Sequence, residues 1–111
     1  MLIDIFGDSP QVKVIDFLLD SQGYDHSLSD IARGAEVTRP TLYKILEELL
    51  ELEIIKETRK VGNAKLFSLN KGNGIVKILT RFDFELSKKL VRKGIAESES
   101  ETPRIIQEIV R

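Results

Sequence analysis

One stretch of the chain, residues 27–69, constrains the fold more than any other. It reads SLSDIARGAEVTRPTLYKILEELLELEIIKETRKVGNAKLFSL. Ser27 and Asp30 have the spacing of a capping box, which predicts that a short helix begins here. Thr38 and Pro40 predict the start of a longer helix, because a threonine hydroxyl can cap it and the first turn does not need the N–H that proline lacks. The stretch is therefore expected to contain a short helix, a turn and a longer helix.

The second of these helices, over residues 38–52, carries apolar residues at helical spacing, which predicts one buried face: Leu42, Ile45, Leu46, Leu49 and Leu52. After it, residues 54–60 and 65–69 read as short strands, and the Val-Gly-Asn-Ala sequence between them predicts a turn. The sequence thus predicts a mainly helical chain with one small β-hairpin at 54–69, an α+β fold.

The flanking segments complete the expected organisation. Ser9 and Pro10 predict a first helix that runs to about residue 22 and ends before Gly23. A last long helix is expected within residues 73–94, with Gly94 at its end. Four regions follow: an apolar N-terminal segment at 1–8, a main domain at 9–72, the last helix at 73–94, and an acidic linker with a short amphipathic tail at 95–111.

Composition excludes several classes of function. The chain of 111 residues has no cysteine, which rules out a disulfide framework, a thiolate metal site and a cysteine nucleophile. Its one histidine, His26, is expected on the surface of a loop, and no cofactor is expected. Glu47, Glu48 and Glu51 read as a solvated helix face, because no nucleophile or metal partner accompanies them. With no apolar run of membrane-spanning length, we expect a cytoplasmic protein that is not an enzyme.

The chain resembles the winged helix-turn-helix transcription regulators of the broad ArsR/MarR-like group. The strings LSDIA, VTRPTLYKILEELLELEII and VGNAKLFSLN carry this resemblance, which covers roughly residues 9–93. Small prokaryotic regulators, archaeal ones among them, have similar strings. The resemblance implies a DNA-binding regulator whose second motif helix is the recognition helix and whose hairpin is the wing.

One departure concerns the turn of the motif. Such turns usually have glycine at a residue with positive φ, and Glu36 holds that position here, whereas Gly34 lies two residues earlier. A non-glycine residue in this conformation costs about 1 kcal/mol. Metal-responsive members also use cysteine clusters or histidine–aspartate pairs, which gives metal sensing little support here.

The resemblance places the start of the recognition helix against base edges in the major groove and the wing on the adjacent minor groove or backbone. A guanidinium can donate two hydrogen bonds to guanine, so Arg39 is the expected base reader. The helix N-terminus also favours a phosphate. The predicted DNA contacts are Thr38, Arg39, Thr41, Tyr43, Lys44, Arg59, Lys60, Asn63 and Lys65.

Apolar residues outside the expected core predict a homodimer. One face of the last helix carries Ile75, Leu79, Phe82, Leu86 and Leu90, and other faces carry Val76, Phe84 and Val91. One small domain cannot easily bury all of them, and exposed apolar patches usually mark an interface. The residues expected at the dimer interface are Leu2, Ile3, Ile5, Phe6, Phe84 and Val91. Alternatively, residues 1–6 pack over the chain's own core.

The net charge of −1 leaves a second reading open. DNA-binding domains are usually basic, so a winged-helix module that serves protein assembly is the alternative to a sequence-specific regulator. A DNA-binding regulator that senses a small molecule is a variant of the regulator hypothesis, but no group of polar residues in the sequence indicates which effector it would bind. Operator, target genes and direction of regulation are not encoded in these patterns.

Overall fold

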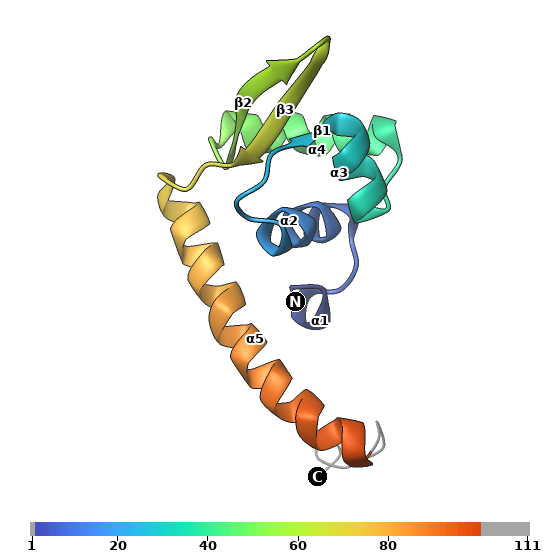
Figure 1. Cartoon of the computed structure of the whole chain (residues 1–111), viewed down its shortest axis with the longest axis vertical. Coiled ribbons are helices and arrows are strands. Elements are labelled where there is room, and N and C mark those ends of the chain that lie inside the picture. Colours follow the sequence, from blue (N-terminus) through green and yellow to red (C-terminus); the bar gives the residue numbers. More distant parts are fainter. Residues whose placement is uncertain (1, 101–111) are drawn as a thin grey trace.

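The computed structural model describes the backbone of residues 2–100 and the side chains of residues 2–92. Figure 1 shows a body of short helices with a protruding hairpin at one end and a long helix that projects away from it. The elements are α1 (Ile3–Phe6), α2 (Pro10–Asp20), β1 (His26–Ser27), α3 (Leu28–Ala35), α4 (Arg39–Glu51), β2 (Ile55–Val61), β3 (Ala64–Leu69) and α5 (Gly74–Ser100).

Three helices, α2, α3 and α4, surround the core. Their most deeply buried side chains include Val14, Ile31 and Leu42, each inaccessible to solvent. The predicted starts of two helices are confirmed: Ser9 caps α2 by accepting from the Val12 N–H, and Ser27 and Asp30 form a reciprocal capping box on α3. The short-helix, turn and longer-helix order predicted for this region is therefore present.

The turn between α3 and α4 explains the unusual position of glycine. Glu36 has a left-handed backbone with φ 57°, as the sequence predicted, and its N–H bonds the carbonyls that end α3. Gly34 serves a different purpose. A Cβ at this position would lie 2.1–2.6 Å from three ring atoms of Phe17 on α2. Gly34 lets α3 approach α2 closely, and Glu36 adopts the strained left-handed backbone conformation.

Glu36→Gly is expected to raise the free energy of unfolding by about 1 kcal/mol, because glycine adopts positive φ without a Cβ clash. Urea denaturation monitored by circular dichroism would measure it. Glu48→Gly is the matched control, since it makes the same change inside α4 and should destabilise by about 1 kcal/mol. A loss of stability in both variants would contradict the strain assigned to Glu36.

The sheet has three antiparallel strands in the order β1-β3-β2. The predicted hairpin is confirmed, with its turn at Gly62 and Asn63, and Gly62 has φ 61°. The short strand β1 was not predicted. His26 pairs with Phe67 of β3, packs in a tilted arrangement against Phe17 at 4.8 Å between ring centroids, and places Nε2 2.9 Å from Ser21 Oγ. The expectation of a surface loop histidine was wrong, because tertiary packing brings this segment to the sheet.

The loop before α5 ties the long helix to the body. Asn73 accepts hydrogen bonds from the N–H groups of Ile75 and Val76, which caps α5, and its side-chain amide donates to the carbonyls of Leu52 and Glu53. Val76 is the fully buried anchor of α5, with Leu79 packed against the core. Of the apolar face that the sequence placed on this helix, Ile75 and Phe82 are 47% and 39% exposed.

The long helix also extends further than predicted. α5 continues through Gly94 to Ser100, so residues 95–100 are helical and are not a linker. A glycine inside a helix costs only about 1 kcal/mol, which the surrounding helix-forming residues can offset. The predicted tail at 103–111 lies outside the described residues. No helix in the described part of the chain has the length and apolarity that a membrane crossing requires.

The N-terminal segment packs between α2 and α5. Leu2 is 3% exposed and its N–H donates to Asp16 Oδ1 at 3.0 Å, so this residue belongs to the chain's own core. Its assignment to a dimer surface was therefore wrong. Ile3, Ile5 and Phe6 do remain exposed, although the Phe6 ring lies 5.8 Å from that of Phe82 on α5.

Candidate nucleic-acid interface

The starts of α3 and α4 and the tip of the hairpin surround one hollow of about 320 Å³. Its lining combines backbone near two helix N-termini with basic and amide side chains: Ser27, Leu28, Ser29, Arg39, Lys60, Asn63, Ala64 and Lys65. Four of the nine predicted contact residues, Arg39, Lys60, Asn63 and Lys65, therefore meet at one place. They come from segments more than twenty residues apart in the sequence.

Arg39 is exposed at the first position of α4, and its Nη2 donates to Ser29 Oγ on α3. This contact orients the guanidinium across the gap between the two helices of the motif. Ser29 was not predicted as part of the site. Its place beside the capping box was visible in the sequence, but its distance from Arg39 depends on the turn between α3 and α4.

Thr38 occupies the N-cap position of α4 as predicted, but it does not form the predicted capping hydrogen bond. Its hydroxyl donates to Thr41 Oγ1 at 2.9 Å, and no side-chain bond caps the helix. Thr41 lies one turn further along the same face of α4, and its hydroxyl oxygen accepts the hydrogen bond from the Thr38 side chain. The free N–H groups at the start of α4 thus stay available to an external acceptor.

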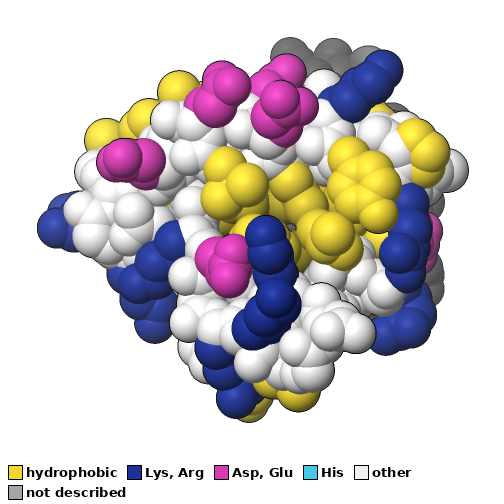
Figure 2. Space-filling view, turned by 90° about the horizontal axis from the view of Figure 1, so that it is seen from above, with side chains coloured by type: hydrophobic (Ala, Val, Ile, Leu, Met, Phe, Trp, Pro, Cys, Tyr) yellow, Lys and Arg dark blue, Asp and Glu magenta, His cyan; other side chains and the backbone are white. Residues whose placement is uncertain are grey.

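Tyr43 and Lys44 follow on the exposed side of α4, and Tyr43 is 48% exposed. Figure 2 views the molecule from the end where the hairpin projects. Lys and Arg side chains gather in several groups around a central hydrophobic patch, while most of the visible Asp and Glu lie toward one edge and one lies beside a basic side chain near the centre. A chain with a net charge of −1 thus has an unequal charge distribution at this end.

Arg59 lies apart from the other predicted wing residues. Its Nε and Nη2 donate to the Asp25 carboxylate at 2.9 and 3.2 Å, and Thr58 Oγ1 donates to the same carboxylate at 2.6 Å. Neighbouring strand residues normally face opposite sides. Here the register of β2 shifts between Glu57 and Arg59, and this β-bulge brings Thr58 and Arg59 to one carboxylate.

These hydrogen bonds from Arg59 and Thr58 hold the pKa of Asp25 at about 2, below the ordinary 3.8. A depressed carboxyl pKa stabilises the folded chain above pH 3.8, and this contribution is lost as the pH falls through about 2. At neutral pH the Arg59–Asp25 pair is therefore fully ionised. Asp25 was not predicted as part of the site, because only the bulge and the loop after α2 bring it to the wing.

At the hairpin tip the charges are less constrained. Lys65 Nζ lies 3.9 Å from Glu57 Oε1, a long and exposed ion pair that contributes little to stability. Lys60 forms no ion pair within the side chains that the structure describes. The tip thus presents two weakly engaged ammonium groups beside Asn63.

A second group of titratable residues lies away from this interface. Asp16 and Asp20 of α2 and Asp83 of α5 place carboxylate oxygens within 4.8 Å of one another. Burial, and then repulsion from Asp16, raises the pKa of Asp20, and the same two causes raise that of Asp83. The sequence did not predict this cluster, because α2 and α5 are distant along the chain.

No protein-family model matches the sequence, and no curated protein is significantly similar to it. Solved structures do share its fold. A double mutant of Lactococcus lactis ZitR in apo form has a TM-score of 0.63 and 22% identity, covering 91% of this chain and 76% of that chain. MepR, a transcription regulator of the Staphylococcus aureus multidrug efflux pump MepA, has a TM-score of 0.60 and 19% identity, covering 91% and 78%.

The adhesin competence repressor AdcR of Streptococcus pyogenes is a third such structure, with a TM-score of 0.63 and 13% identity, covering 91% of this chain and 71% of that chain. The predicted fold class is confirmed by the element order, the antiparallel hairpin and these likenesses. The chain has a winged helix-turn-helix fold, with α3 and α4 as the motif and β2–β3 as the wing.

Proposed function

We propose that this protein is a sequence-specific, DNA-binding transcription regulator that acts as a homodimer. One observation carries the proposal: Arg39 at the start of α4 and Lys60, Asn63 and Lys65 of the wing border a single hollow. In this fold the start of the second motif helix enters the major groove and the wing follows the adjacent minor groove or backbone. The likeness to MepR and AdcR supports the same role.

Each side chain then has a definite task. Arg39 donates two hydrogen bonds to guanine O6 and N7. Thr38, Thr41 and Lys44 contact phosphates, and Tyr43 offers its phenol to a phosphate or a base edge. In the wing, Lys60 and Lys65 neutralise backbone charge, and Asn63 bonds sugar or base edges. The free N–H groups at the start of α4, to which Pro40 contributes none, add partial positive charge for a phosphate.

The homodimer is supported by α5. This helix projects from the body in Figure 1, and its apolar side chains beyond Val76 include Phe84 and Val91, which are 59% and 54% exposed. Exposed apolar residues in such numbers usually mark an interface. A two-fold dimer through α5 and the exposed side of α1 would set two recognition helices about one DNA turn apart.

Fluorescence anisotropy tests the proposal, with the DNA upstream of the protein's own gene and a scrambled control over a range of salt. Specific binding with a log–log salt slope of about −0.9 per neutralised phosphate is the expected result. Gel filtration with and without DNA gives the oligomeric state. No binding at low salt would contradict the proposal and favour a protein-assembly module.

Asp25→Asn is expected to release Arg59 toward the DNA backbone, because the carboxylate that holds the guanidinium is lost. The salt slope should then become steeper by about 0.9, the value for one additional phosphate contact. Asp8→Asn removes the same charge from the exposed N-terminal segment and serves as the control. An Asp25→Asn slope identical to that of the Asp8 variant would exclude competition between Asp25 and DNA for Arg59.

A further inference from the structure

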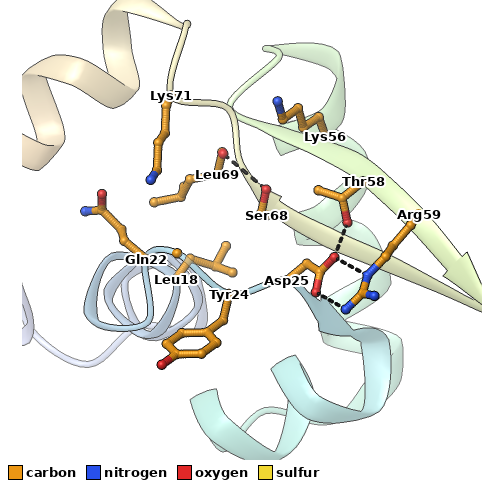
Figure 3. Close-up of a pocket in the computed structure, with 11 residues that line it drawn as sticks. Leu18, Gln22, Tyr24, Asp25, Lys56, Thr58, Arg59, Ser68, Leu69 and Lys71 are labelled. Atoms are coloured by element: carbon orange, nitrogen blue, oxygen red, sulfur yellow. Dashed lines mark hydrogen bonds and ion pairs between the residues drawn. The ribbon is translucent and has the colours of Figure 1, made fainter.

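A cavity of about 460 Å³ opens between the end of α2, the outer side of the sheet and the loop before α5. Its floor is apolar, made by the buried side chains of Leu18 and Leu69. Figure 3 shows Lys71 reaching toward Gln22 on one rim, with Lys56 of β2 across from it. The volume lies within the range of about 300–1,000 Å³ that small-molecule sites occupy.

The polar groups around this floor are mostly donors. Lys56 and Lys71 form no ion pair within the described side chains, so two ammonium groups lack an anionic partner. The Gln22 amide adds a neutral donor, whereas the Ser68 hydroxyl donates to the carbonyl of Leu69 at 3.3 Å. Among the residues that the structure describes, Asp25 has the only carboxylate that lines the cavity, and Arg59 and Thr58 already bind it. The free positive charge of the cavity is therefore about two.

We propose that this cavity binds a small organic phosphate. The dianionic phosphate monoester lies between Lys56 and Lys71, because two ammonium groups match its charge and lysine is a common phosphate ligand. Its organic part covers Leu18 and Leu69, and the Gln22 amide donates to its oxygens. This inference goes beyond the proposed function and does not rest on DNA binding.

The arrangement favours a small molecule over a DNA phosphate. The cavity has two leucine side chains at its floor, whereas the hollow with Arg39, Lys60 and Lys65 is a separate one. Among the nine predicted DNA contacts, Arg59 alone lines the cavity, and its guanidinium is held by Asp25.

Amide chemical-shift titration in phosphate-free buffer tests this site. The probes are glucose 6-phosphate and adenosine 5′-monophosphate, with glucose and adenosine as the uncharged counterparts. We expect saturable shifts of the Gln22, Ser68 and Lys71 amides with the phosphates alone. The Lys56→Gln/Lys71→Gln variant should lower the affinity by at least about tenfold, because both charged donors to the phosphate are lost.

Lys89→Gln is the matched control, because Lys89 is an exposed lysine on α5 that does not line the cavity. Its affinity should equal that of the unchanged chain. Equal binding of the uncharged probes, undiminished affinity in the double variant, or shifts at this cavity with duplex DNA but not with the small phosphates would each overturn the proposal. None of these results depends on whether the protein recognises a specific DNA sequence.

Discussion

Arg39→Ala is expected to weaken binding to the specific DNA site by about 1–3 kcal/mol, which corresponds to a loss of about five- to 160-fold in affinity. A bidentate contact between a guanidinium and guanine makes this difference, and alanine offers no donor to replace it. Affinity for unrelated DNA should fall much less, because phosphate contacts from other residues dominate it. The base preference at one operator position should therefore relax.

Arg81→Ala is the control for the loss of one positive charge. Arg81 lies on α5 and does not line the hollow between the wing and the start of α4. Anisotropy titrations would measure the affinity of both variants for the specific site and for single-base variants of that site. If Arg39→Ala binds all single-base variants with the same order of preference as the unchanged chain, Arg39 takes no part in sequence recognition.

Gly34→Ala is expected to lower the free energy of unfolding by about 1–3 kcal/mol, the range for overpacking a core. Its new Cβ would collide with the Phe17 ring at 2.1 Å, and that ring also packs against His26 of β1. Movement of Phe17 therefore disturbs the contact between α2 and α3 and the attachment of β1. Urea denaturation would measure the loss of stability.

Gly74→Ala is the matched control, because a Cβ there meets nothing within 4 Å and the residue begins α5. It should leave stability unchanged or raise it slightly. The change at Gly34 should also cost less in a Phe17→Leu background, where the ring is absent. Equal losses with and without the Phe17 ring would rule out the collision as the cause.

Local signals predicted most of the elements. The capping box of Ser27 and Asp30, the Ser9 cap and the Gly62 turn each depend on interactions within a few residues, so the linear sequence contains all the partners. Glu36 belongs with them, because the length of the turn demanded a left-handed residue whatever its side chain. The meeting of Arg39 with Lys60, Asn63 and Lys65 has a different cause, because the packing of the fold brings these distant segments to one end.

Signals that need a distant partner were misread. Periodicity could not show which stripe of α5 meets the core, since the loop at Asn73 sets the rotation of the helix and makes Val76 the buried anchor. Strict strand alternation could not reveal the bulge that turns Arg59 toward Asp25. Thr38 is an exception, because its expected capping bond is replaced by a contact with Thr41 only three residues away.

The sequence by itself determined the order of the elements, the position of the motif and the residues at its exposed tip, because propensity, capping and hydrophobic spacing are local properties. The tertiary structure decided the close approach of α3 to α2 at Gly34, the pairing of Arg59 with Asp25, and the cavity between Lys56 and Lys71. These features join segments that lie far apart along the chain. Their energies depend on distances that arise only when the core has packed.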